Sequence, residues 1–376
     1  MPWKVFPMRE QRLALVHRVI LLGRCVAEVA REFGVSRKTA YKWLKRFRQG
    51  DSLVDQSRRP KRSPRRSDSG IEAKVLEARQ RYNWGPRKIR KLLEEDHPPT
   101  IRTVGRILKR LGCVPQTLPT PQTIPQPFER PAPNDLWQID HKGYLEVQRQ
   151  KVMPLTVLDD HSRYCLCLHP CLDLTMSTAW QILWELFGQV GLPAAILSDN
   201  AFGKTRTFPG ISGFDMRLIR LGIQPLHGRP YHPQTQGKVE RLHGSMMREL
   251  FNFNARRDCI EHFTQDCENW RMIYNTQRPH EALRDQTPIC RWKPSDRKRP
   301  DELPQVSYPA DAILRRVSYS GDFRYRNARI LVGRALARES VRIEVADQDI
   351  AVYYGWKRIR VIHNQLLNGP RCDKMV

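Results

Sequence analysis

Three acidic residues in the middle of the chain lie at positions that are typical of metal-binding active sites. Asp140 ends the short apolar run LWQID, and Asp199 ends the run AAILSD. A buried strand that ends in an acid delivers its carboxylate to the carboxyl edge of an open sheet, where active sites tend to lie. Glu240 lies in a later segment, 227–250. Three carboxylates from two strands and one helix can hold a pair of divalent metal ions for phosphoryl transfer.

The segment 227–250, HGRPYHPQTQGKVERLHGSMMREL, predicts a loop that becomes a helix at Thr235 or Gly237. Its apolar residues recur at steps of three and four, as in an amphipathic helix, and leave Glu240 on the free face. An acid near the start of a helix is also stabilised by the helix dipole, so Glu240 alone is a weak signal. The two strand-end acids make the catalytic interpretation the stronger one.

Neighbouring residues offer rival interpretations. Asp159 and Asp160 also end a strand-like run, and we expect them to serve a surface role on an adjacent strand or to pair with Arg163. His243 follows Glu240 at the E-x-x-H spacing of di-iron helix bundles. Such a bundle needs a second copy of the motif, which the sequence lacks, so we do not expect a di-iron site.

The positive charge of the chain is concentrated in its amino-terminal part. A length of 376 residues allows about two to four domains. The net charge of +26 and the pI near 10.1 predict a polyanionic partner. Residues 1–114 contain 29 Lys and Arg against 11 Asp and Glu, whereas the remainder is nearly balanced. This asymmetry indicates a nucleic-acid reader joined to an enzyme, and a basic surface that only aids solubility explains it poorly.

Residues 1–50 are expected to form a helix-turn-helix domain that binds double-stranded DNA. Three short helices are predicted, with a turn at Gly34 and with Ser36 as the cap of the third helix. Ala40, Leu44 and Phe47 form the predicted inward stripe of that helix. The residues expected to face the DNA are Arg37, Lys38, Tyr41, Lys42 and Lys45. The alternative is a basic amphipathic helical hairpin that does not enter a DNA groove.

Residues 70–114 are expected to form a second helix-turn-helix domain. A basic linker, 51–69, precedes it, and a Pro-rich spacer, 115–133, follows it. Arg102 and Arg106 in its last helix are expected to contact DNA. A purely structural helical unit is the alternative here.

The remaining chain predicts an α/β core and a small β-domain, so the predicted fold class is multidomain α+β. Residues 134–290 alternate strand and helix patterns, which favours a mixed sheet flanked by helices. Thr175 is placed to cap a helix that runs to about Val190, and Asp258 to cap a later one. Residues 305–364 alternate like half-buried strands, and we expect a small barrel-like domain.

The cysteines and the amino-terminal residues indicate a cytoplasmic protein. The amino-terminal residues lack the apolar core of a signal peptide, and no apolar run reaches the roughly 18–20 residues that span a bilayer. The nine cysteines are therefore expected to be reduced thiols. Cys165, Cys167 and Cys171 cluster in a strand-like run without a second ligand pair, so we expect no zinc site there.

Five segments carry a resemblance to a known family: LWQIDHKG, TVLDDHSRY, ILSDNAF, RPYHPQTQGKVERLHGSM and YNTQRPHEAL. With them, essentially the whole chain resembles a DDE transposase of the bacterial insertion-sequence type, whose RNase H-like core is similar to that of retroviral integrases. The resemblance implies that Asp140, Asp199 and Glu240 are the catalytic residues and bind two Mg²⁺ or Mn²⁺ ions. It also implies cleavage of the element's ends, joining of the 3′-OH ends to target DNA, a homo-oligomer on DNA, and association with the bacterial nucleoid.

One position departs from the family's pattern. The family tends to place a basic residue seven positions after the glutamate, and this position is Met247 here. Arg248 is adjacent to it and Arg241 is earlier in the same helix, so both are candidate DNA contacts. A DNA-binding regulator or domesticated remnant with an inactive core therefore remains the main alternative. A metal-dependent nuclease that does not join strands is the third.

Overall fold

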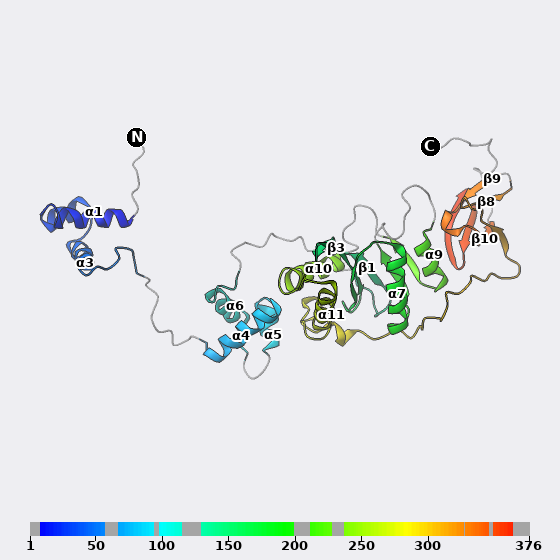
Figure 1. Ribbon diagram of the computed structural model, residues 1–376, viewed down its shortest axis with the longest axis horizontal. Coiled ribbons are helices and arrows are strands. Elements are labelled where there is room, and N and C mark those ends of the chain that lie inside the picture. The colour runs from blue at the N-terminus through cyan, green and yellow to red at the C-terminus, as the bar shows by residue number, and fades with distance from the viewer. Residues whose placement is uncertain are drawn as a thin grey trace. The chain divides into compact units, whose positions relative to one another are not determined.

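A computed structural model describes residues 8–56, 67–93, 98–114, 129–198, 211–227, 237–326, 328–345 and 349–363 (Figure 1). The chain divides into two compact units, Met1–Arg66 and Ser67–Val376. No helix in the described ranges is long and apolar enough to cross a membrane.

The first unit is a three-helix domain made of α1 (Met8–Ile20), α2 (Val26–Glu32) and α3 (Arg37–Arg48). Ser36 caps α3 as predicted, because its Oγ accepts a hydrogen bond from the backbone N–H of Thr39 at 3.1 Å. The predicted inward stripe is wrong at one position. Trp43 is buried, whereas Phe47 is 37% exposed. The guanidinium of Arg12 lies over the Trp43 ring at 4.0 Å, so the large ring fills the core and carries a cation on its face.

The second unit begins with another three-helix arrangement: α4 (Ser69–Tyr82), α5 (Pro86–Leu92) and α6 (Ile101–Arg110). Val104, Ile107 and Leu108 of α6 pack into a core that also contains Trp84. Thr100 caps α6 by accepting from the N–H of Thr103. The helical region expected at the amino-terminal end of the chain is therefore confirmed.

A six-stranded mixed sheet follows, with the order β2-β3-β1-β5-β6 and with β4 paired to β3. β1 is antiparallel to β3 and parallel to β5, and β5 is parallel to β6. The strands are β1 (Trp137–His141), β2 (Leu145–Val147), β3 (Gln150–Asp159), β4 (Cys165–Cys171), β5 (Ala195–Ser198) and β6 (Gln224–His227). This is a mixed α/β sheet, as expected for this part of the chain.

Helices cover both faces of this sheet (Figure 1). On one face α7 (Met176–Val190) and α9 (Gly213–Arg220) pack against Leu155 and Val157 of β3. On the other face α10 (Gly237–Met246), the π-helix η2 (Met247–Phe251) and α11 (Ile260–Thr276) pack against Val152 and Leu158 of the same strand. The alternation of apolar residues along β3 thus builds two cores.

The helix caps of this core agree with the predictions in one case and differ in the other. Thr175 caps α7 by accepting from the N–H of Thr178. The cap of α11 is Cys259, not Asp258, because the Cys259 Sγ accepts from the N–H of His262. Two short 3₁₀ helices, η3 (Glu281–Leu283) and η4 (Pro288–Arg291), follow α11.

The carboxy-terminal strands form two open sheets. One has the order β12-β11-β10-β7 and is antiparallel throughout, and the other is the pair β8-β9. The bounds are β7 (Ile313–Arg316), β8 (Asp322–Tyr325), β9 (Ala328–Leu331), η5 (Arg334–Leu336), β10 (Ser340–Val345), β11 (Asp349–Tyr354) and β12 (Lys357–His363). The predicted barrel-like closure is not confirmed, because the described strands pair only within these two sheets.

Candidate active site

Asp140 lies near the carboxyl end of β1, a strand between β3 and β5 in the sheet. Its side chain is 21% exposed, so the carboxylate is accessible although the preceding residues of the strand are buried. The parallel pairing of β1 with β5 ends at Ile139 and Ser198, which directly precede Asp140 and Asp199 in the sequence. Asp199 itself lies outside the described residues.

Glu240 is exposed in the first turn of α10, as predicted. The opposite face of α10 is buried through Val239, Leu242 and Met246, which belong to the core shared with β3 and α11. Lys238 fixes the start of the helix, because its Nζ donates to Asp160 Oδ1 at 2.5 Å and to the Asp160 carbonyl at 3.2 Å. The burial of one face therefore directs the Glu240 side chain away from the core.

His243 connects α10 directly to β1. Its Nε2 lies 2.9 Å from Thr156 Oγ1, and its Nδ1 lies 3.8 Å from Asp140 Oδ2. Thr156 Oγ1 also donates to the backbone carbonyl of Asp140 at 3.0 Å. Burial, together with the charge of Lys142, lowers the pKa of His243 to about 4. The E-x-x-H spacing was the sequence signal for this residue, but it did not reveal the contact with Asp140.

The expectations for Asp159 and Asp160 are corrected by the structure. Both residues are wholly buried, not on the surface. Asp159 accepts hydrogen bonds from the Ser162 Oγ at 2.6 Å and from two backbone N–H groups. Asp160 pairs with Lys238, and Arg163 pairs with Glu129 instead. These acids hold the strand end and the start of α10 together, since their oxygens are occupied by protein donors.

Met247 begins the segment that follows α10. Here the helix becomes the π-helix η2, a feature that often marks functional sites. Met247 is partly buried and packs against the core of α10 and α11, so this position contributes apolar contacts. Arg248 is exposed, and its guanidinium lies over Gly244, where an added Cβ would be 3.4 Å from Nη1. Arg248 thus reaches back along the helix towards the turn that carries Glu240.

A buried ionic cluster, which sequence reasoning missed, joins η2 to other elements. Glu249 accepts from Arg278, which follows α11, and from Lys88 of α5 at 2.7 Å. Burial opposes ionisation of Glu249, but the hydrogen bonds and charges of Arg278 and Lys88 outweigh it and lower the pKa of this carboxyl. Asn83 Nδ2 also donates to the Arg248 carbonyl at 2.7 Å. The second helical domain therefore contacts the segment that follows the Glu240 helix.

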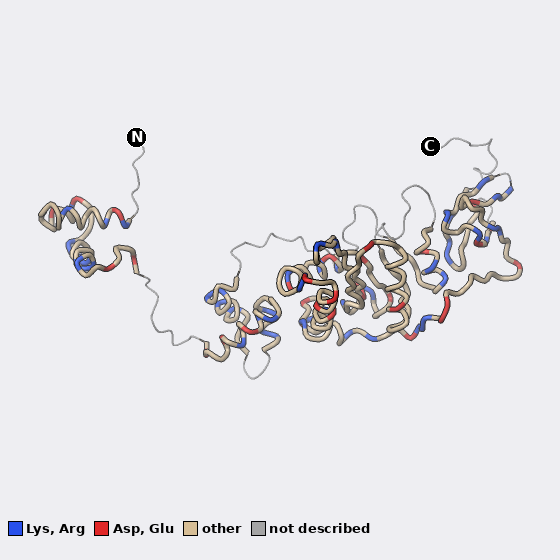
Figure 2. Tube along the Cα trace, in the orientation of Figure 1, with Lys and Arg blue, Asp and Glu red and all other residues tan. Residues whose placement is uncertain are grey.

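The side chains predicted to contact DNA are all exposed. On α3 these are Arg37, Lys38, Tyr41, Lys42 and Lys45, and on α6 they are Arg102 and Arg106. Arg241 on α10 is exposed as well. Figure 2 shows the Lys and Arg positions along these helices. Their exposure is compatible with DNA contact, which remains a prediction.

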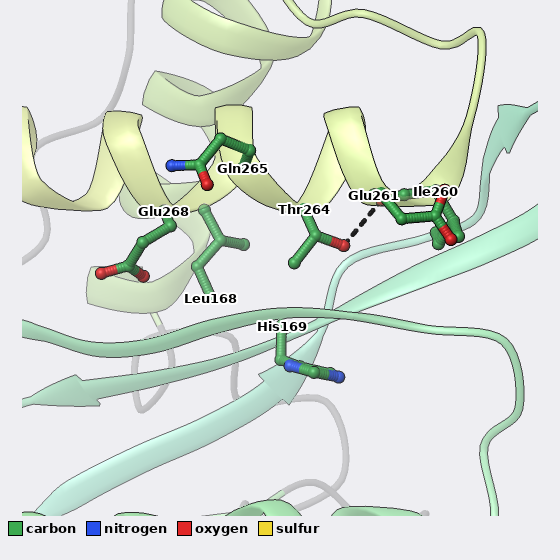
Figure 3. Close-up of a pocket in the computed structure, with 7 residues that line it drawn as sticks. All are labelled: Leu168, His169, Ile260, Glu261, Thr264, Gln265 and Glu268. Atoms are coloured by element: carbon green, nitrogen blue, oxygen red, sulfur yellow. Dashed lines mark hydrogen bonds between the residues drawn. The ribbon is translucent and has the colours of Figure 1, made fainter.

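A surface hollow of about 560 Å³ lies between β4 and α11, and neither Asp140 nor Glu240 lines it (Figure 3). It is lined by Leu168, His169, Ile260, Glu261, Thr264, Gln265 and Glu268. Close to it, Asp258, Cys259 and His262 have ligand atoms within 4.8 Å of one another, the one such group of three among the described residues. The Cys259 Sγ already accepts the N–H of His262, so this group is explained by the capping of α11.

Comparisons with known families agree with this architecture. Residues 130–233 and 221–288 match integrase core domains. Residues 11–61 match a helix-turn-helix domain, and residues 39–108 match a homeodomain-like domain. The chain therefore contains segments that match helix-turn-helix domains and segments that match an integrase core.

The chain is also similar to individual proteins. The chain is 24% identical over 380 residues to the "Putative transposase for insertion sequence element IS5376" of Geobacillus stearothermophilus, covering 91% of this chain and 85% of that protein. In length and domain content it is thus similar to a transposase of the bacterial insertion-sequence type. It is also 32% identical over 114 residues to the Gag-Pro-Pol polyprotein of Mason-Pfizer monkey virus, which covers 30% of this chain but only 6% of the polyprotein.

Two solved structures are similar in part. One is the intasome of simian T-cell lymphotropic virus in complex with a PP2A regulatory subunit, at 15% identity and a TM-score of 0.40, covering 77% of this chain and 96% of that one. The other is the HTLV-2 integrase catalytic core in complex with magnesium, at 17% identity and a TM-score of 0.33, covering 43% and 97%. Because both scores are below 0.5, the assignment depends on the sequence matches.

Proposed function

We propose that this chain binds the ends of a mobile element, cleaves them by metal-dependent hydrolysis, and joins the freed 3′-OH ends to target DNA. The observation that carries the proposal is the distance of 3.8 Å between His243 Nδ1 and Asp140 Oδ2. This contact brings α10, the helix of Glu240, to the end of the strand that carries Asp140. Two of the three expected acids are therefore on elements that meet.

The donor set suits hard divalent cations. Asp140, Asp199 and Glu240 would supply carboxylate oxygens, which Mg²⁺ and Mn²⁺ prefer. Among the described acids of this region, Asp140 is partly exposed and Glu240 is exposed, whereas the nearby Asp159 and Asp160 are occupied by protein donors. Two bound ions would activate the attacking hydroxyl and stabilise the leaving 3′ oxygen.

The residues of the chain would position the acids and the DNA. Thr156 holds the Asp140 carbonyl, and the buried apolar face of α10 keeps Glu240 directed outward. Arg241 and Arg248 on the exposed side would contact the DNA backbone as cations, without reading sequence. No covalent link between protein and DNA is needed, so no nucleophilic serine or tyrosine is assigned.

The domains would divide the work. We propose that residues 1–50 and 70–114 read the element's ends, with 51–69 and 115–133 as linkers. Residues 134–290 would catalyse the reaction, and 305–364 would form the carboxy-terminal β-domain. Pairing two DNA ends requires at least two active sites, which supports a homo-oligomer on double-stranded DNA. A cytoplasmic, nucleoid-associated location would follow from this substrate.

The test is strand transfer with the element's own terminal DNA in Mg²⁺ or Mn²⁺. We expect product from the wild type and none from Asp140→Asn or Glu240→Gln, with end binding retained in both. Glu146→Gln, which changes an exposed acid on β2, is the matched control and should retain activity. Specific binding without any metal-dependent product from the wild type would favour a DNA-binding regulator. Metal-dependent cleavage without joining would favour a nuclease.

A further inference from the structure

His243 is a buried polar side chain beside Asp140, and the proposed function leaves its role open. It is 7% exposed, and both ring nitrogens face polar atoms of the site. Helical spacing places it one turn after Glu240, on a neighbouring part of the same surface. Because buried polar groups are normally hydrogen-bonded, both ring nitrogens of this imidazole should have a partner.

The hydrogen bonds of Thr156 assign the tautomer of the ring. The Thr156 hydroxyl has one hydrogen, and it is donated to the Asp140 carbonyl oxygen, which can only accept. The Thr156 oxygen can therefore only accept from His243, so Nε2 carries the ring hydrogen. In the neutral ring Nδ1 then carries no hydrogen and offers its lone pair, and it lies 3.8 Å from Asp140 Oδ2.

His243 Nδ1 and Asp140 Oδ2 are both hydrogen-bond acceptors, so they cannot bond to each other, but a cation between them could bind both. Nitrogen and oxygen ligands bind first-row divalent ions at about 2.0–2.3 Å, so two neighbouring ligands of one ion are roughly 3–4 Å apart. The separation of 3.8 Å between Nδ1 and Oδ2 falls in that range. An Nε2–H that donates to an oxygen is also the usual way in which a ligating imidazole is oriented.

We infer that His243 Nδ1 is a ligand, together with Asp140, of one of the divalent ions in the proposed site. This inference rests on the proposed function and adds a nitrogen to its oxygen donors. A mixed nitrogen and oxygen site favours Mn²⁺ over Mg²⁺, because Mg²⁺ prefers oxygen ligands and imidazole binds transition metals. The E-x-x-H motif, which does not indicate a di-iron bundle here, then supplies two residues to a single metal site.

The test uses Mn²⁺ as the probe on the full-length chain. Electron spin-echo spectroscopy of bound Mn²⁺ detects a directly coordinated imidazole nitrogen, and an EPR titration gives the affinity. We expect nitrogen coupling in the wild type, its loss in His243→Gln, and Mn²⁺ binding that is weaker by about tenfold or more in the variant. His262→Asn, which alters the Asp258–Cys259–His262 group, is the control and should change neither quantity.

The outcomes separate this inference from the proposed function. Mn²⁺ binding that depends on Asp140 but shows no nitrogen coupling, or coupling that persists in His243→Gln, would overturn the role of His243 and leave the transposase proposal in place. Mn²⁺ binding that is unaffected by Asp140→Asn would count against the site itself. Because His243→Gln removes a buried ring, Thr156→Val provides a second variant with the ring retained. We expect weaker Mn²⁺ binding there, and unchanged binding and coupling would overturn the inference.

Discussion

Arg278 and Glu249 form a buried two-point ion pair, with Nε 2.7 Å from Oε2 and Nη2 2.9 Å from Oε1. Arg278 also donates to Ser245 Oγ at 2.9 Å. Lys88, from the second helical domain, shares the same carboxylate at 2.7 Å. The π-helix that follows the Glu240 helix is therefore held by charges from two other parts of the chain.

Removal of Arg278 should cost far more stability than removal of Lys88. In Arg278→Met, Glu249 loses two of its three hydrogen bonds, so we expect the free energy of unfolding to fall by about 3–5 kcal/mol. In Lys88→Met, Arg278 still neutralises the carboxylate, and the loss should be about 1 kcal/mol or less. Urea unfolding measures both, with the exposed Lys109→Met as a control. Equal losses would contradict this division of roles.

Acidic pH should destabilise the fold through His280. Burial, followed by the charges of Arg278, Lys88 and Arg163, lowers the pKa of His280 to about 2. The unfolded chain binds a proton here near pH 6.5 and the folded chain does not. Stability from this group is thus complete above about pH 6.5 and falls by up to about 1.4 kcal/mol per pH unit below it.

The variant His280→Gln isolates this contribution. Glutamine keeps an acceptor for Arg278, which lies 3.3 Å from the ring Nε2, but it does not titrate. Denaturation at pH 7 and pH 5 should show a smaller loss in the variant than in the wild type. His17→Gln, on α1 of the other unit, controls for removal of a histidine elsewhere. The same pH dependence in wild type and His280→Gln would rule out this source.

Loss of charge at Asp160 should lower the free energy of unfolding far more than loss of charge at Glu240. Asp160→Asn places an amide among the buried donors Lys238, Gln138 and the Arg130 N–H, so we expect a loss of about 2–4 kcal/mol in unfolding free energy. Glu240 is exposed, and Glu240→Gln should change stability by less than about 0.5 kcal/mol. Thermal unfolding of the two variants makes the comparison. A large loss in Glu240→Gln would mean that this acid is structural.

Arg248 should contribute to DNA affinity without contributing to sequence preference. Arg248→Ala removes an exposed guanidinium that lies along the helix over Gly244, so the fold should be unaffected. A lost phosphate contact weakens binding about equally for all sequences and reduces the slope of log affinity against log salt by about 1. Titrations at several salt concentrations measure this slope. The exposed Lys298→Ala is the charge-matched control, and an equal change in it would show only a general charge effect.

Local patterns in the sequence were sufficient for the elements and for some of their ends. Apolar runs predicted β1 and β5, helical spacing predicted α10, and the caps Ser36 and Thr175 were predicted correctly. These features depend on neighbours a few residues away, so the sequence carries them directly. The predicted inward stripe of α3 was wrong at Phe47, because Trp43 also fits a helical stripe and is the residue that the fold buries.

The tertiary structure decided which of the described acids are accessible and which are occupied by protein donors. Asp140 and Asp160 both end apolar runs, and no local pattern separates them. The carboxylate of Asp160 is occupied because the fold brings Lys238, 78 positions away in the sequence, within hydrogen-bond distance. His243 reaches Thr156 across 87 positions, and Lys88 reaches Glu249 across 161. The sequence alone determined the candidate residues and the family they resemble. Packing determined which of them are accessible and which are paired, because hydrogen-bond partners are set by contacts between distant segments.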